Sequence, residues 1–183
     1  EPEYADMPNE QRNYIKNYVT SFESALNGAD FKDPSTGYRS YIDLYSFIDY
    51  YIINELSRNV DGYRLSAFFY KDKNSNGGKL TMGPLWDYNL GFGNADYYNG
   101  GSTNGWVIDG IGSGDSYQVP FWWDRLRDDP YFDAHLKIRW ETLRNDKFSD
   151  TNINAFIDSC AALLETAQQR NFQKFQVLNT YVW

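Results

Sequence analysis

Two helical patterns precede a run of strand-forming residues, and this order is the feature that most constrains the fold. The first pattern starts near Pro8 and repeats apolar side chains at three- and four-residue spacing as far as Leu26. Gly28 stands where such a helix should end. The second pattern has Ser40 as its predicted N-cap and carries its apolar stripe to Leu56. The N-terminal third of the chain is therefore predicted to be helical.

Strand-forming residues follow in two short runs. Residues 63–70 and 79–82 are rich in side chains that favour strands, and residues 71–78 between them are polar and rich in Asn and Gly. We expect these runs to pair as a β-hairpin with a long loop. Residues 91–118 hold many glycines and no apolar period, and they predict an ordered but irregular loop because aromatic side chains can anchor it.

Three further helical patterns complete the chain. They begin at Pro120, after Asp129 and at Ser149, and the last carries Cys160 on its apolar face, where we expect a buried thiol. The predicted fold class is α+β, mainly α-helical with one β-hairpin. A length of 183 residues favours a single domain over 1–183. Aromatic residues make up 19% of the chain, which excludes disorder for most of its length.

The charge and the rare residue types exclude several functions. With 17 Lys and Arg against 25 Asp and Glu, the net charge is −8, so the sequence argues against nucleic acid as a partner. The chain has one cysteine and one histidine, which leaves no intramolecular disulfide and no Cys/His metal cluster. Any metal site must therefore use oxygen ligands. No apolar run approaches the roughly 20 residues of a transmembrane helix.

Two carboxylates flank the predicted hairpin. Asp61 precedes its first strand and Asp87 follows its second, so strand pairing would bring both to the same end of the ribbon. Such a pair suits Mg²⁺, which prefers a few carboxylates together with phosphate and water oxygens. The order of helix, Asp-bearing loop, hairpin and second Asp is also that of a protein-kinase C-lobe. On spacing alone, the alternative that Asp61 lies in an ordinary turn and Asp87 caps the next segment is favoured.

The residues around these carboxylates carry a family resemblance. The runs NELSRNVDGYRLS from Asn54 and GPLWDYNLGFGN from Gly83 resemble the C-terminal part of the spore coat protein H (CotH) kinase family, whose most specific motif is Trp-Asp-x-(Asp/Asn)-x-x-Phe-Gly. Residues 11–26, 120–123 and 170–172 extend the resemblance to secreted or lipid-anchored Bacteroidetes-type members. The resemblance therefore covers nearly the whole chain.

The resemblance implies a kinase-like protein that transfers phosphate from ATP to Ser or Thr of secreted or coat proteins. It makes Asp61 the catalytic-loop Asp and Asp87 a Mg²⁺ ligand, with Asn89 in the position of a second metal ligand that is Asp in many members. It also implies a secreted or cell-surface bacterial protein. No Gly-rich loop with a following strand and Lys precedes Asp61, so we expect this chain to be roughly a C-lobe that alone binds ATP weakly or not at all.

Other interpretations of the sequence stay open. A noncatalytic surface module could bind polysaccharide or a partner protein through aromatic residues between Gly91 and Trp123. The candidates for a sugar platform are Tyr97, Tyr98, Trp106, Trp122 and Trp123, although the alternative that most of them are core residues is favoured. A glycosidase could use Asp61 and Asp87 as paired carboxylates. The hairpin loop holds Asp-x-Asn-x-Asn-Gly over 72–77, which matches the start of a Ca²⁺ loop, but Gly83 replaces its closing Glu and a plain polar loop is favoured.

Overall fold

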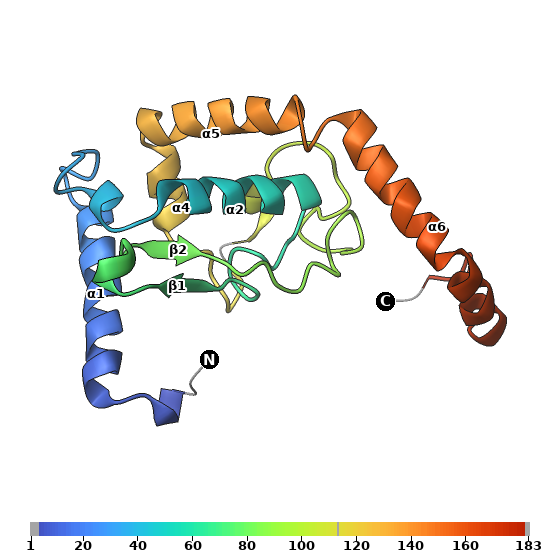
Figure 1. Ribbon diagram of the computed structural model, residues 1–183, viewed down its shortest axis with the longest axis horizontal. Helices are drawn as coiled ribbons and strands as arrows, with labels where there is room; N and C mark the ends of the chain where they lie inside the picture. Colours follow the sequence, from blue (N-terminus) through green and yellow to red (C-terminus); the bar gives the residue numbers. More distant parts are fainter. Residues whose placement is uncertain (1–3, 113, 182–183) are drawn as a thin grey trace. The chain divides into compact units, whose positions relative to one another are not determined.

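The computed structural model describes residues 4–112 and 114–181, and it divides into two units, one ending at Arg139 and the other beginning at Trp140. The expectation of a single domain stays a prediction. The elements of the chain are drawn in Figure 1 and are, in order, α1 (Asn9–Asn27), α2 (Leu44–Ser57), β1 (Phe69–Lys71), β2 (Leu80–Met82), α3 (Val107–Gly110), α4 (Trp122–Arg127), α5 (Pro130–Arg144) and α6 (Asp150–Lys174). The α+β class and its helical majority are confirmed.

The core of the first unit is built from aromatic rings of α1, α2 and α4. The ring of Trp123 lies 5.8 Å from that of Phe47 and 5.1 Å from that of Tyr63, while Trp122 meets Phe22 of α1 at 5.1 Å. Trp122 and Trp123 are both buried. They therefore belong to the core, and neither forms part of a sugar platform.

The hairpin is confirmed, but its first strand is shorter than predicted. Phe69 pairs with Met82 and Lys71 with Leu80, in antiparallel register. Residues 63–66 form turns instead of a strand, because the carbonyl of Asp61 accepts hydrogen bonds from the amides of residues 64, 65 and 66. These local hydrogen bonds, and not the strand propensity of the residues, determine the backbone conformation here. As a result, Asp61 does not directly precede β1.

Helix α2 begins at a different cap from the predicted one. Ser40 lies in a short 3-10 turn, and Asp43 is the N-cap, whose carboxylate accepts a hydrogen bond from the amide of Ser46 at 3.0 Å. Residues 41–43 are tied to the hairpin instead, since the amide of Leu80 donates to the carbonyl of Tyr41 and that of Asp43 to the carbonyl of Leu80. The hairpin therefore lies directly against the start of α2 (Figure 1).

The last helix starts as predicted but does not bury its apolar face. The Ser149 side chain accepts a hydrogen bond from the amide of Asn152, which confirms it as the N-cap of α6. No described residue of α6 is buried: Leu163 is 83% exposed, and Cys160, predicted to be buried, is exposed. Helical spacing shows that a face is apolar but does not supply a surface to cover it. None of the described helices has the length and apolar character that crossing a membrane requires.

Candidate functional site around Asp61 and Asp87

The turn that follows α2 presents Asp61. Helix α2 ends at Ser57, and Arg58, its C-cap, adopts a left-handed conformation with φ 55°. The hydroxyl of Tyr50 donates to the carbonyl of Gly62 at 2.5 Å. A Cβ on Gly62 would lie 2.0 Å from Oδ1 of the buried Asn54, so only glycine fits at this close approach to α2. The turn is therefore held tightly against the helix.

Both oxygens of the Asp61 carboxylate have partners. Oδ1 lies 3.1 Å from Nη2 of Arg64, and Oδ2 accepts a hydrogen bond of 3.0 Å from the hydroxyl of Tyr97. The Asp61 side chain is 15% exposed. Burial and this hydrogen bond raise the pKa of the Tyr97 phenol to about 12, so the phenol is a neutral donor at physiological pH. The carboxylate is thus fixed in orientation and already accepts a hydroxyl proton in a hydrogen bond.

Arg64 joins Asp61 to the irregular loop. Its side chain is only 3% exposed, and Nη1 lies 2.8 Å from Oδ1 of Asp115. The guanidinium also lies 5.0 Å from the ring centre of Tyr98, whose hydroxyl donates to Asp115. This hydrogen bond is the main reason that the pKa of the Asp115 carboxyl is lowered. One buried cation therefore serves two carboxylates from distant parts of the sequence.

Two charged residues at the end of α2 attach the loop at further points. The carboxylate of Glu55 accepts from the amides of Val107 at 2.6 Å and Ile108 at 3.2 Å, and burial raises its pKa. Arg58 donates to the carbonyls of Asn99 and Gly105. Among the described residues of 91–118 the one regular helix is the short α3, and this segment is attached by polar bonds as well as by aromatic side chains.

Asp87 lies on the surface after β2. It is exposed and has a positive φ of 62°, which is uncommon for a residue with a side chain and recurs at functional sites. Its Oδ2 accepts a weak hydrogen bond from the hydroxyl of Ser66 at 3.4 Å. Because Ser66 belongs to the same turn as Asp61, this contact makes the two Asp-bearing segments neighbours. The turn, and not the strand pairing assumed from the sequence, supplies the connection.

Buried polar side chains at the end of α2 support the segment after Asp87. Oδ1 of Asn54 accepts from the hydroxyl of Tyr88 at 2.9 Å, and the carbonyl of Ser57 accepts from the amide of Phe92 at 2.5 Å. Both Asn54 and Ser57 are fully buried. The sequence interpretation missed these supports, although polar residues within an apolar helical pattern were a signal that could have found them.

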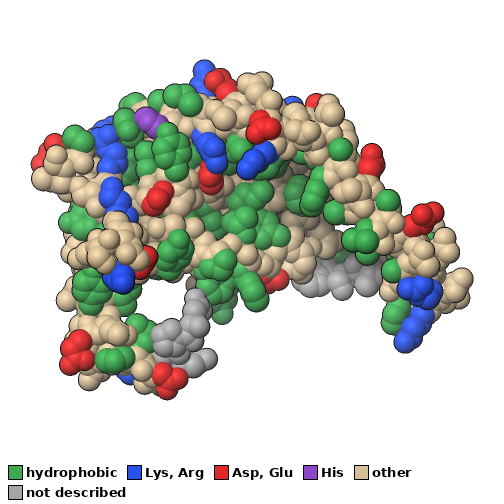
Figure 2. Space-filling model, in the orientation of Figure 1, with side chains coloured by type: hydrophobic (Ala, Val, Ile, Leu, Met, Phe, Trp, Pro, Cys, Tyr) green, Lys and Arg blue, Asp and Glu red, His purple; other side chains and the backbone are tan. Residues whose placement is uncertain are grey.

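Exposed apolar side chains lie near Asp87 in the sequence. Leu85 and Trp86 precede it and are both more than half exposed, and the Trp86 ring packs edge to face on Phe68 at 6.1 Å. Phe92 follows and is also exposed. Figure 2 shows hydrophobic side chains gathered over the part of the molecule that holds α2 and the hairpin. The segment that carries Asp87 thus exposes apolar side chains on both sides of it in the sequence.

The donor set around Asp87 suits a metal that is shared with a ligand. Within residues 4–112 and 114–181, no three acidic, His or Cys side chains cluster as a metal cage. Asp87 and Asn89 are both exposed oxygen donors, and Mg²⁺ is commonly held by one or two carboxylates together with phosphate oxygens and water. Both side chains are thus of a donor type that Mg²⁺ accepts, and their role as its ligands stays a prediction. In the 72–77 loop, Asp72 accepts from Lys73 and Asn76, so its oxygens already have partners within the loop.

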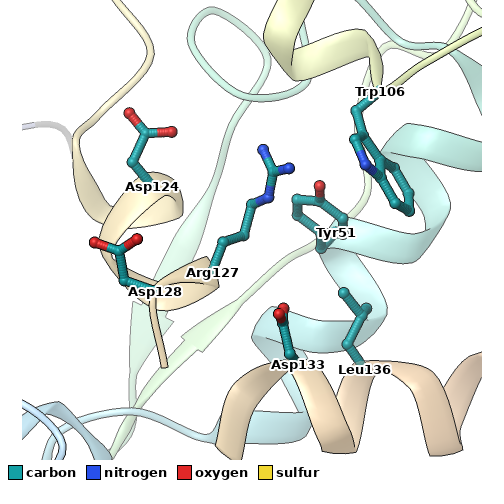
Figure 3. A pocket seen from close by; sticks show the side chains of 7 residues that line it. All are labelled: Tyr51, Trp106, Asp124, Arg127, Asp128, Asp133 and Leu136. Carbon is teal, nitrogen blue, oxygen red and sulfur yellow. The ribbon is translucent and has the colours of Figure 1, made fainter. Parts of the chain in front are cut away.

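A pocket of about 500 Å³ lies apart from these carboxylates. It is lined by Tyr51, Trp106, Asp124, Arg127, Asp128, Asp133 and Leu136, and none of Asp61, Asp87 and Asn89 is among them. Figure 3 shows the Arg127 side chain extending between Asp124 and Asp128 on one side and the rings of Tyr51 and Trp106 on the other. Arg127 forms an ion pair of 2.8 Å with Asp109. This pocket combines acidic groups with the half-exposed ring of Trp106.

The comparisons with known proteins identify the family. A family model described as CotH kinase protein matches residues 1–182, so the chain belongs to the CotH kinase family. Searches of curated proteins and of solved structures found no match. The family resemblance drawn from the sequence is confirmed. The likeness to secreted Bacteroidetes-type members, the kinase-like C-lobe architecture and the roles of Asp61, Asp87 and Asn89 stay predictions.

Proposed function

We propose that this protein acts in phosphate transfer from ATP to a Ser or Thr hydroxyl of a protein, with Asp61 as the residue that receives the hydroxyl. One observation carries the proposal: Oδ2 of Asp61 accepts a hydrogen bond from a hydroxyl group at 3.0 Å. A general base must lie within about 2.6–3.2 Å of the group whose proton it takes. Asp61 is thus oriented for the role that the family resemblance gives it.

The remaining residues supply position and charge. Arg64 holds Oδ1 of Asp61, so Oδ2, which accepts the hydroxyl of Tyr97 in this structure, is the oxygen that an acceptor hydroxyl would use. Asp87 and Asn89 would hold a Mg²⁺ ion together with the ATP phosphates, and that ion would neutralise charge on the phosphates. Asp61 would orient the acceptor hydroxyl and take its proton as the hydroxyl oxygen bonds to the γ-phosphorus of ATP, while the bond from that phosphorus to ADP, the leaving group, breaks. Most of the acceleration would come from this positioning and from charge stabilisation.

The strands that cover the nucleotide in a kinase are the next feature to consider. Among the described residues, no strand precedes Asp61. The nucleotide in a kinase is covered by strands and contacted by a Lys from them. We therefore propose that this chain alone binds ATP weakly. Secreted or coat proteins are the proposed acceptors, with the protein itself outside the cell or on its surface.

The test compares this chain with a chain extended upstream. Both are assayed for transfer of labelled phosphate from ATP, with Mg²⁺ and dephosphorylated casein as the probe acceptor. Asp61→Asn and Asp87→Ala should each abolish transfer by the extended chain. Asp158→Asn, which changes an exposed carboxylate of α6, is the matched control and should leave transfer unchanged. Phosphate transfer that is retained by the Asp87→Ala variant would contradict the assignment of Asp87 as a Mg²⁺ ligand.

The pocket beside Trp106 favours a second candidate function, which is binding of a surface polysaccharide. The Trp106 ring is 49% exposed, so a sugar ring could stack on it while the carboxylates of Asp124 and Asp128 accept bonds from sugar hydroxyls. Calorimetric titration with soluble bacterial polysaccharides tests this candidate. Trp106→Ala should weaken binding at least tenfold, whereas binding that is unaffected by this change would exclude the pocket as the site.

A further inference from the structure

The Tyr97 hydroxyl occupies the place on Asp61 that an acceptor hydroxyl needs. Its oxygen lies 3.0 Å from Oδ2 of Asp61, within the range over which a general base contacts its substrate. The other carboxylate oxygen is held by Arg64 at 3.1 Å. With only 15% of the Asp61 side chain exposed, little of the carboxylate is open to an incoming group. A substrate hydroxyl would therefore compete with that of Tyr97 for Oδ2 of Asp61.

Tyr97 is held in this place by the contacts of its neighbour in sequence. The ring of Tyr98 packs edge to face on Tyr97, with 5.4 Å between ring centres, and its hydroxyl donates to Asp115. Asp115 is in turn bound to Arg64, which also holds Asp61. The loop that carries Tyr97 is thus attached to the same guanidinium that orients the proposed base.

We propose that Tyr97 is an autoinhibitory residue, which occupies the acceptor position on Asp61 and is held there by the Arg64–Asp115 ion pair. The inference rests on the proposed function, because it assigns regulation to the same site. Displacement exchanges one O–H···O⁻ hydrogen bond for another, so the exchange itself costs little. The cost lies in releasing the loop from Arg64. An acceptor that loosens the Asp115 contact would therefore gain access to Asp61.

A purely supporting role for Tyr97 makes the opposite prediction. If its hydroxyl served only to orient Asp61, its removal would lower the turnover rate and would not improve acceptor binding. If it competes with the acceptor, its removal lowers the acceptor KM. The two roles are therefore separated by the KM and kcat of the same variant.

The first experiment measures phosphate transfer by the extended chain over a range of casein concentrations. Tyr97→Phe should lower the acceptor KM at least threefold, with the ATP KM unchanged and kcat not reduced. Asp115→Asn, which weakens the attachment of the loop, should change the acceptor KM in the same direction. Tyr18→Phe is the matched control, since the hydroxyl of Tyr18 donates to the carbonyl of Tyr41 at 2.8 Å. An unchanged KM or a lower kcat for Tyr97→Phe overturns the proposal.

A second experiment tests the contact without any activity. The ionisation of Tyr97 is followed by NMR of the protein carrying ¹³C-labelled tyrosine, with the signal assigned by its loss in Tyr97→Phe. Asp61→Asn should lower the pKa of the Tyr97 phenol from its value of about 12, because the Asp61 carboxylate helps to raise it. An unchanged pKa overturns the inference even where phosphate transfer is found. Full transfer by Asp61→Asn instead overturns the proposed function, and with it any inhibition through Asp61.

Discussion

Arg64 and Asp115 form an ion pair of 2.8 Å in which the arginine side chain is almost completely buried, although 51 positions separate the two residues in the sequence. The same guanidinium contacts Asp61. Breaking a buried ion pair by removing one partner leaves an uncompensated charge, which is strongly destabilising. The stability of the loop and the orientation of Asp61 should therefore depend on one side chain.

We expect Arg64→Met to lower the thermal midpoint clearly, because it leaves two partly buried carboxylates without their cation. Arg144→Met is the control, since Arg144 pairs at 2.9 Å with the exposed Asp150. Exposed ion pairs contribute little, so the control should change the midpoint only slightly. Circular dichroism during heating measures both variants. Equal midpoints for the two variants would contradict the bridging role of Arg64.

Gly62→Ala should destabilise the protein by roughly 1–3 kcal/mol, the range for overpacking a closely packed site. The added Cβ would lie 2.0 Å from Oδ1 of Asn54, which is buried and already bonded to the hydroxyl of Tyr88. Urea unfolding measures the change. Gly101→Ala serves as the control because a Cβ there meets no atom within 4 Å, and it should leave the free energy of unfolding nearly unchanged.

The buried Glu55 should make stability depend on pH. Burial raises its pKa in the folded protein above the ordinary value of 4.5, so folding favours the protonated carboxyl. Its contribution to stability is therefore fully present below about pH 4.5 and is lost as the pH rises through the raised pKa. The difference in unfolding free energy between the protein and Glu55→Gln, measured across this window, should change in that direction. A difference that does not vary with pH would contradict the assignment to Glu55.

Cys160 should react with a thiol reagent in the folded protein. It is the single cysteine of the chain and lies exposed on α6. We expect labelling by 5,5′-dithiobis(2-nitrobenzoic acid) within minutes in native buffer, at a rate within about tenfold of that in urea. A thiol that reacts only after unfolding would show that the apolar face of α6 is covered in solution.

Local patterns in the sequence were sufficient for much of the fold. The helices that start near Pro8 and at Ser149 follow from apolar spacing and from capping residues, because residues three and four positions apart lie on one face of a helix. The second hairpin strand and the polar loop before it follow from strand propensity and from Asn and Gly residues. The candidate carboxylates Asp61 and Asp87 were also selected from the sequence, through the motifs around them.

Only the tertiary structure decided what these residues contact. Residues 63–66 form a turn because the carbonyl of Asp61 binds three amides, and this turn brings Ser66 to Asp87. The carboxylate of Asp61 contacts the side chains of Arg64 and Tyr97. Tyr97 lies 36 positions further along the chain, and no local period in the sequence connects it to Asp61. Spacing in the sequence determines which face of an element is apolar or charged. Which surface or side chain meets that face depends on contacts between distant segments, and these formed only in the folded chain.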